Sequence, residues 1–192
     1  MKRVLLLVSH TGSGSNALVN VLNHNPRIQF HNTDLVYKHP EVLDILTANP
    51  HKCNTTAATW AEEILYNYQF SCKPLYKMCK FIYLVRDAKY LGANDFLYYC
   101  YRLRRICEMA RQTPGSFLMT WEDLSTERCF PMLEKFLCLR QPLERGLIMK
   151  DASKGLLNPH LVDQAQKTYE RYLHFLRNGC QLQWDFCFSS VS

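Results

Sequence analysis

The chain has 192 residues, and its 23 lysines and arginines against 17 aspartates and glutamates give a formal net charge of +6. This length predicts one domain with a substantial core, over residues 1–192. The hydrophobic fraction of 47% and the charged fraction of 21% are ordinary for a globular protein and exclude a disordered chain, a collagen and a coiled coil.

Apolar runs and cysteines point to a cytoplasmic protein. The longest apolar run near the start, Val4 to Val8, is far shorter than the roughly 20 residues of a membrane span and too short for a signal-peptide core. The nine cysteines show no CxxC spacing and lie in apolar surroundings, which favours reduced thiols over a disulfide framework or a zinc site. We therefore expect neither membrane contact nor a bound metal.

The first element is predicted to be a central parallel strand over residues 4–8, because an aliphatic run bounded by turn formers is typical of a strand buried on both faces. Apolar residues at helical spacing then predict a helix that ends within residues 23–26. A second strand is expected over 28–30, followed by helices over 34–49 and 57–68.

In the second half of the chain the pattern alternates again. Strands are expected over 81–85 and 116–120, and helices over 93–112, 121–137 and 159–176. Strands that alternate with helices predict an α/β fold of three layers, with a central parallel sheet flanked by helices. Ligands of such sheets bind at the carboxyl ends of the strands, which directs attention to the loops after Val8, Val85 and Thr120.

The loop after the first strand is a run of small residues that fits a phosphate or sulfate group. Its backbone N–H groups can turn toward one point, and the next helix directs its positive end there, although a tight turn without a ligand gives the same pattern. No lysine follows at Walker A spacing, which excludes a conventional ATP-hydrolysing P-loop. Gly12, Gly14 and Ala17 match the dinucleotide fingerprint GxGxxA, with Asp34 about 20 residues on, so a Rossmann-type NAD(P)-binding oxidoreductase stays open.

The same loop resembles the 5′-phosphosulfate loop of sulfotransferases that use 3′-phosphoadenosine 5′-phosphosulfate (PAPS). The resemblance lies in Ser13-Gly14-Ser15-Asn16 after a buried strand, with the helix ending at an Asn-Pro pair. The family usually reads Pro-(Lys/Arg)-Ser-Gly-(Thr/Ser)-Thr, so Thr11 and Gly12 replace its proline and its basic residue. The resemblance implies a P-loop-like sulfotransferase architecture and these cofactor-binding residues: Thr11, Gly12, Ser13, Gly14, Ser15 and Asn16.

A second segment resembles the 3′-phosphate motif of the family. The strand that ends in Arg86-Asp87-Ala88 matches Arg-(Asp/Asn)-Pro, and Asn94 stands where the family has a serine. The resemblance implies that Arg86 and Asn94 bind the 3′-phosphate, a task that suits the planar, permanently charged guanidinium. A surface ion pair is the alternative for an Arg-Asp pair at a strand end.

Two more segments follow in the order of the family. Residues 116–124 resemble its strand and Tyr-Glu-Asp-Leu segment, with Trp121 in place of the tyrosine. The expected role of Glu122 and Asp123 is to start a helix. Lys150, Lys154 and Gly155 stand where the family has a basic loop over the nucleotide, and the alternative for them is a solvated loop.

The resemblance implies transfer of a sulfuryl group from PAPS to a hydroxyl or amine of an acceptor such as a carbohydrate or small alcohol, leaving 3′-phosphoadenosine 5′-phosphate (PAP), without a metal. His31 and Asp34, just after the second strand, are the candidates for the general base, because they would lie beside the first loop if that strand neighbours the first. Gly12 cannot supply the cation of the usual loop, so either a residue such as His10, Lys150 or Lys154 replaces it, or the transfer is slow, or the site only binds the nucleotide. A catalytically silent PAPS- or PAP-binding module is the alternative.

A cluster of arginines raises the question of nucleic-acid binding. Arg102, Arg104, Arg105 and Arg111 lie within one predicted helix. They lack interleaved exposed aromatic residues and a long basic run, so we interpret them as a solvated helix face and expect no nucleic-acid partner.

Overall fold

The computed structural model describes residues 3–10, 12–31, 55–60, 79–87, 96–148 and 159–184. Within these ranges five parallel strands form one sheet in the order β2-β3-β1-β4-β5. The central place of β1 confirms the buried strand predicted from the first aliphatic run. The strands are β1 (Arg3–Ser9), β2 (Ile28–His31), β3 (Thr55–Trp60), β4 (Cys79–Val85) and β5 (Phe117–Thr120).

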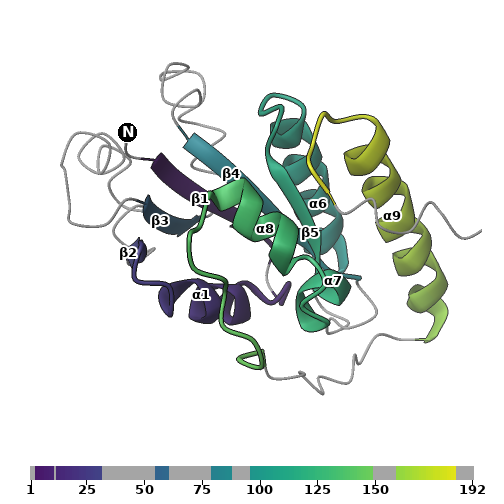
Figure 1. Ribbon diagram of the computed structural model, residues 1–192. Coiled ribbons are helices and arrows are strands. Elements are labelled where there is room, and N and C mark those ends of the chain that lie inside the picture. The colour runs from purple at the N-terminus through teal and green to yellow at the C-terminus, as the bar shows by residue number, and fades with distance from the viewer. Residues whose placement is uncertain are drawn as a thin grey trace, which may run out of the picture.

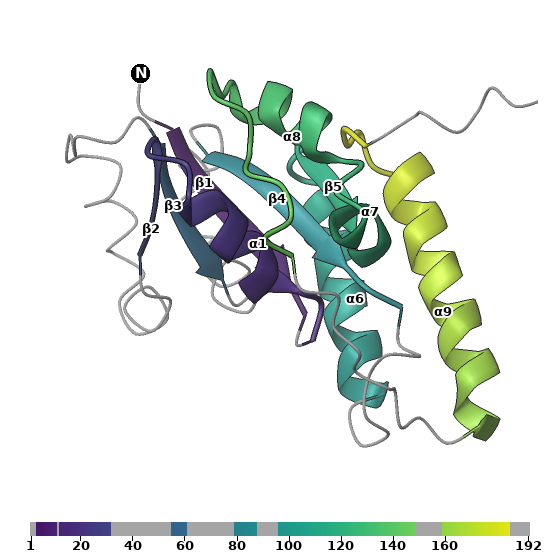
Figure 2. The same ribbon diagram turned by 60° about the horizontal axis from the view of Figure 1, so that its bottom comes forward.

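Helices cover both faces of the sheet, as Figures 1 and 2 show. One face carries α1 (Ser15–Asn23), α7 (Trp121–Ser125) and α8 (Phe130–Leu137), and the other carries α6 (Phe96–Ala110) and α9 (Pro159–Asn178). In β4, Phe81 and Tyr83 join the core under α6 and α9, whereas Ile82 and Leu84 join the core under α1 and α8. The molecule therefore has an α/β fold, and burial on both faces explains the continuous apolar strands.

The prediction of a helix over 57–68 is wrong at its start. Residues 57–60 belong to β3, which pairs in parallel with β1 on one side and with β2 on the other. Three threonines and a tryptophan within Thr55–Trp60 favour a strand, and the pairing with two neighbours outweighs the helical spacing of the apolar residues. The helix predicted over 34–49 lies outside the described residues.

The helix predicted over 121–137 is interrupted. It divides into α7 and α8, because Glu127 adopts a φ of 55° and Pro131 lies in the first turn of α8. Proline has no backbone N–H and is tolerated only at the start of a helix, so the second helix begins there. The predictions over 93–112 and 159–176 are confirmed in their described parts by α6 and α9.

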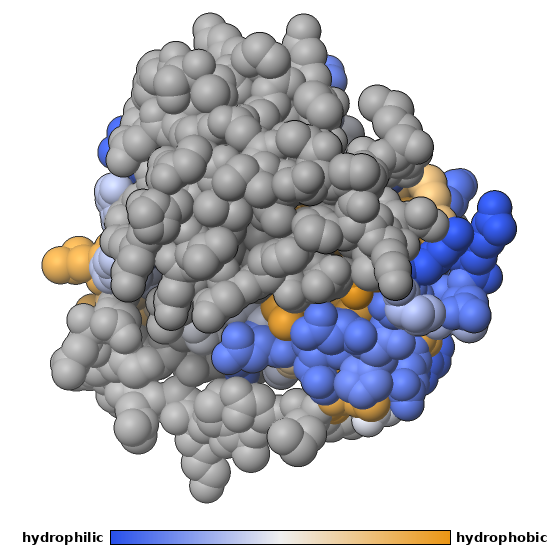
Figure 3. Space-filling view, turned by 90° about the vertical axis from the view of Figure 1, so that its left-hand side faces the viewer, coloured by the Kyte–Doolittle hydropathy of each residue, from blue (hydrophilic) through white to orange (hydrophobic). Residues whose placement is uncertain are grey.

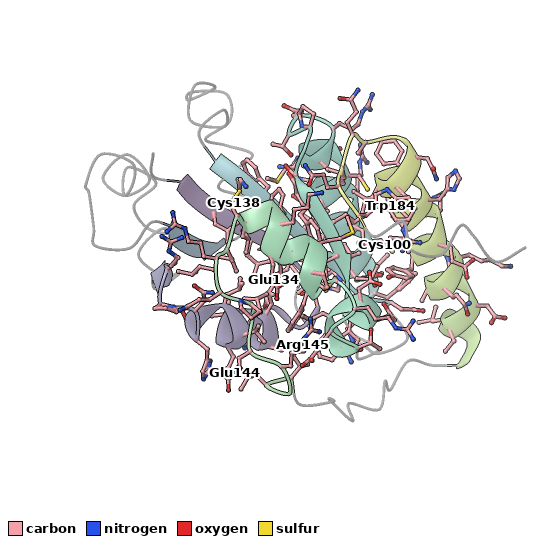
Figure 4. The ribbon with its side chains drawn as sticks, viewed as in Figure 1. Cys100, Glu134, Cys138, Glu144, Arg145 and Trp184 are labelled. Atoms are coloured by element: carbon pink, nitrogen blue, oxygen red, sulfur yellow. The ribbon has the colours of Figure 1, made fainter. Side chains whose placement is uncertain are left out.

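The segment after α8 runs back along that helix. The Leu143 N–H donates to Oε1 of Glu134 on α8 at 2.8 Å, and Nη1 of Arg145 donates to the carbonyl of Glu127 at 3.1 Å (Figure 4). Leu143 and Ile148 are buried in the core that α1 and α8 share. This packing fixes the chain up to residue 148 against the face of the sheet that carries α1.

On the side of the molecule that carries β2 and α1, the surface of the described residues is largely polar (Figure 3). Asn16, Asn20 and Asn23 are exposed on α1, and most of the described surface in Figure 3 is hydrophilic. Among the described helices, none combines the length and the apolar composition that crossing a membrane requires. Cysteines with described side chains are free thiols: Cys100, Cys107, Cys129, Cys138 and Cys180.

Candidate functional site

The ends of three strands define a candidate site at the carboxyl edge of the sheet. The parallel register aligns Ser9 with Leu84 and Val85 with Thr120, so the chain leaves β1, β4 and β5 at one edge. The helix after β1 is α1, and the next described helix after β4 is α6, on the opposite face. Adjacent strands whose following helices lie on opposite faces leave a crevice, which is the usual ligand site of open α/β sheets.

Residues 12–16, here called the glycine loop, comprise the compact turn after β1 and the first two residues of α1. The Ser13 N–H donates to the carbonyl of His10 at 3.1 Å, and the Ala17 N–H donates to the carbonyl of Gly14 at 3.0 Å. Gly12 and Gly14 have φ values of 76° and 96°, in the left-handed region that glycine adopts without strain. Glycine at these two positions lets the chain pass directly from strand to helix.

The ring of Trp121 lies against Gly14. A Cβ atom added at Gly14 would lie 2.2 Å from Cε3 of Trp121, so this position has no room for a side chain. Gly14 is the N-cap of α1, and it provides no side-chain hydrogen bond to the helix. Trp121 therefore excludes the serine, aspartate or asparagine that would normally satisfy the first N–H groups of such a helix.

The amino end of α1 suits an anion. The N–H groups of Ser15 and Asn16 belong to the first turn, where helical geometry supplies no acceptor. Ser13, directly before the N-cap, is fully buried, and its Oγ has no hydrogen-bond partner within the described part of the chain. The first turn contains no acidic residue that would repel an anion. A phosphate or sulfate group would satisfy these donors.

Arg86 links the end of β4 to the glycine loop. Its Nη1 donates to the carbonyl oxygen of Gly12 at 3.0 Å, and its guanidinium carbon lies 4.5 Å from the centre of the Trp121 ring. The residue is only 3% exposed. The carbonyl and the aromatic face together hold a buried positive charge beside the loop.

Two side chains fix the backbone of Arg86. Its N–H donates to Nε2 of His10 at 3.0 Å, and the hydroxyl of Tyr99 donates to its carbonyl at 2.7 Å. Because a backbone N–H only donates, Nε2 of His10 carries a lone pair and the ring is the neutral tautomer with its proton on Nδ1. The two rings meet edge to face, with centroids 4.9 Å apart. Burial raises the pKa of Tyr99, so its hydroxyl stays protonated as a donor.

A capping box positions Trp121. The Asp123 N–H donates to Oγ1 of Thr120 at 3.2 Å, and the Thr120 N–H donates back to Oδ2 of Asp123 at 3.2 Å. These reciprocal bonds start α7 directly at the end of β5, so that its first residue, Trp121, lies at the carboxyl edge. They confirm the helix-starting role predicted for Asp123.

Several predicted site residues come together at this edge, and others lie outside the described ranges. The residues brought together are His10, Gly12, Ser13, Gly14, Ser15, Asn16 and Arg86. The residues outside the described ranges are Thr11, Asp34, Asn94, Lys150, Lys154 and Gly155.

The placement of His31 beside the glycine loop depends on the second strand being the neighbour of the first, and the strand order shows that it is not. His31 is the last residue of β2, and β3 lies between β2 and β1. Two strand spacings of about 4.8 Å separate β2 from β1. The backbone of His31 is therefore further from the loop than expected.

Sequence reasoning did not name Trp121 or Tyr99 as site residues. Trp121 contacts both Gly14 and Arg86, and Tyr99 holds the carbonyl of Arg86. The place of Trp121 immediately after a predicted strand, at the edge where the other loops end, was the available signal. Tyr99 gave none, because it lies within a run of three tyrosines and one cysteine on a helix.

Comparison with models of known protein families gave no match, and comparison with curated proteins gave none either. Within the described ranges no group of three or more His, Cys, Asp or Glu side chains is arranged to hold a metal ion.

Proposed function

We propose that the protein is a sulfotransferase of P-loop-like architecture, which transfers a sulfuryl group from PAPS to a hydroxyl or amine of a small-molecule or glycan acceptor. The observation that carries this proposal is the uncapped start of α1 beside the buried, unpartnered hydroxyl of Ser13. These donors fit the phosphosulfate end of PAPS, and the charge of Arg86 lies on the same loop.

The order of the strands favours the sulfotransferase proposal over a Rossmann-type oxidoreductase. The dinucleotide-binding fold has the order 3-2-1-4-5-6, in which the second strand lies beside the first and its acidic residue reaches the ribose. Here β3 lies beside β1 and separates it from β2. In this fold the strand that follows the GxGxxA motif is not the neighbour of β1, so the motif is not in the structural context of a dinucleotide-binding site.

PAPS supplies the sulfuryl group, and the protein would bind and orient it. The N–H groups of Ser15 and Asn16 would hold the anionic end, as oriented donors commonly do for developing charge. His10 uses Nε2 to accept from the backbone of Arg86, so its role at this site is to support the loop. His31 and Asp34 remain the candidates for the base that takes the proton of the acceptor.

A PAPS- or PAP-binding module without catalysis is the second candidate. It is favoured by the enclosure of Arg86, which bonds to Gly12 and is 3% exposed, and by the absence of a basic residue from the glycine loop. Both candidates bind the same nucleotide, and they differ in whether sulfate leaves it.

Thermal unfolding in the presence of PAPS, PAP, NAD or NADP tests the proposal. PAP and PAPS are expected to raise the unfolding temperature, because a ligand that binds only the folded state stabilises it. Ser13→Ala should weaken PAP binding about 2- to 10-fold, whereas Ser125→Ala, whose hydroxyl already donates to the carbonyl of Glu122, should not. Stabilisation by NAD but not by PAP would overturn the proposal.

A transfer assay separates the two candidates. Labelled PAPS is incubated with the protein and a panel of sugars, phenols and peptides, and the labelled product is measured. The enzyme is expected to label at least one acceptor class. Tight PAP binding without any transfer would support the silent module instead.

A further inference from the structure

We propose that Arg86 acts at the 5′ end of the nucleotide, where it positions the glycine loop and supplies positive charge, and that it is not the ligand of the 3′-phosphate. This inference rests on the proposed function and replaces the role that the family resemblance implies for Arg86. It makes Arg86 a positioning residue for the part of PAPS that carries the sulfate.

The head of the side chain is directed to the glycine loop. Nη1 of Arg86 bonds to the carbonyl of Gly12, two residues before the N-cap of α1, and the guanidinium carbon lies over the ring of Trp121. The same ring lies against Gly14. Arg86 therefore contacts the loop directly at Gly12, and through Trp121 it is connected to Gly14, the N-cap of α1.

The backbone of Arg86 is fixed on both sides, which limits where the head can go. His10 accepts from its N–H at 3.0 Å, and Tyr99 donates to its carbonyl at 2.7 Å. Movement of the guanidinium group to a distant phosphate would break its hydrogen bond to the Gly12 carbonyl while the backbone of Arg86 stayed in place. A planar guanidinium that is both hydrogen-bonded and stacked loses more on such a move than a flexible ammonium would.

The charge of Arg86 compensates for what the loop lacks. Residues 12–16 contain no charged side chain, so the loop offers an anion only backbone donors and polar groups. Arg86 donates to the Gly12 carbonyl and so offsets the partial negative charge of that oxygen within the loop. Because Arg86 is buried, its attraction for a nearby anion is weakened less by water than that of an exposed arginine.

Three adenosine nucleotides separate the two roles: PAP has both phosphates, adenosine 5′-phosphate has only the loop phosphate, and adenosine 3′-phosphate has only the other. If Arg86 acts at the loop, its replacement weakens the binding of PAP and the binding of adenosine 5′-phosphate by the same factor. If Arg86 holds the 3′-phosphate, its replacement weakens the binding of PAP but leaves the binding of adenosine 5′-phosphate unchanged.

The experiment measures the dissociation constants of these three nucleotides by titration calorimetry. The proteins are the natural chain, Arg86→Ala, Arg86→Lys and a control, Arg140→Ala, which removes an exposed arginine after α8. We expect Arg86→Ala to weaken PAP and adenosine 5′-phosphate equally, by about 10- to 100-fold, and Arg140→Ala to change neither. We expect Arg86→Lys to restore part of both losses, because it keeps the charge but not the planar stack.

A loss for PAP that clearly exceeds the loss for adenosine 5′-phosphate would overturn the inference while leaving the proposed function intact. Failure of the natural chain to bind PAP or adenosine 5′-phosphate would overturn the proposed function, and the inference with it. Should the Arg86 variants unfold, nuclear magnetic resonance of the Arg86 guanidinium in the natural chain gives the same answer. Its signals should shift with adenosine 5′-phosphate, and a shift with adenosine 3′-phosphate alone would overturn the inference.

Discussion

Arg86 at the end of β4 donates from Nη1 to the carbonyl oxygen of Gly12, 3.0 Å away in the loop after β1. This bond joins the two strands whose following helices lie on opposite faces of the sheet. It therefore lies at the carboxyl edge of the sheet, between the two strands where open α/β sheets commonly bind their ligands. The loop that would hold an anion and the arginine that carries positive charge form one unit in this protein.

The contact between Gly14 and Trp121 predicts that Gly14→Ala destabilises the protein strongly. The new methyl group would lie 2.2 Å from Cε3 of Trp121, and the residue has a φ of 96°. Overpacking and backbone strain together should lower the free energy of unfolding by about 3 kcal/mol, measured by urea denaturation. Gly115→Ala is the control, since Gly115 has a φ of 77° and no atom within 4 Å of the added Cβ. It should lose only about 1 kcal/mol, and equal losses would show that Trp121 does not restrict position 14.

The hydrogen bond between His10 and Arg86 predicts that removing the imidazole acceptor lowers the stability of the protein. His10→Phe keeps an aromatic ring beside Tyr99 but removes Nε2, which accepts from the buried N–H of Arg86. We expect the free energy of unfolding to fall by about 1–3 kcal/mol. In the natural chain, nitrogen resonances should identify His10 as the Nδ1-protonated tautomer. A proton on Nε2 would contradict the assigned bond.

Much of the fold and part of the site could be predicted from the sequence. The runs at Val4 to Val8 and Phe81 to Val85 are apolar at every position because both faces of these strands are covered by helices. Since parallel strands end at one edge of a sheet, the loops that follow them had to lie near one another. Local patterns thus brought the glycine loop, Arg86 and Trp121 to the same edge.

The remaining features depend on contacts between distant parts of the chain. Nothing local to Thr55–Trp60 indicates that this segment inserts between β1 and β2, so the position expected for His31 was wrong. Gly12 and Trp121 set the direction of the Arg86 side chain. Gly12 lies 74 residues before Arg86, and Trp121 lies after it, in another element of the fold. Motif spacing places an arginine at a strand end but does not say which atom its head will bind.

The buried thiol of Cys107 predicts a loss of stability at alkaline pH. Burial raises the pKa of Cys107 to about 12, from 9.0 in the absence of the fold. Above pH 9 the unfolded chain releases this proton and the folded chain keeps it, so the stability that the group contributes is present below pH 9 and is lost as the pH rises toward 12. Each pH unit above 9 should cost up to about 1.4 kcal/mol for this group. Urea denaturation between pH 8 and pH 10.5 measures the slope.

Cys107→Ala is the control for this pH dependence. The variant should be less stable at neutral pH because it leaves a small cavity in the core between α6 and α9, but its stability should fall less steeply above pH 9. Burial also raises the pKa of Cys100 and Cys180, so a smaller slope should remain. Identical slopes for the two proteins would contradict the burial of an un-ionised thiol at Cys107.

The central claim is that the start of α1 binds the 5′ end of an adenosine nucleotide, and amide resonances measured during a titration with PAP test it most directly. We expect the largest changes at the N–H groups of Gly14, Ser15 and Asn16, with the resonances of Gly115 and Gly146, in turns elsewhere on the chain, unchanged. Binding of PAP that leaves these three amides unmoved, or no binding at all, would contradict the account.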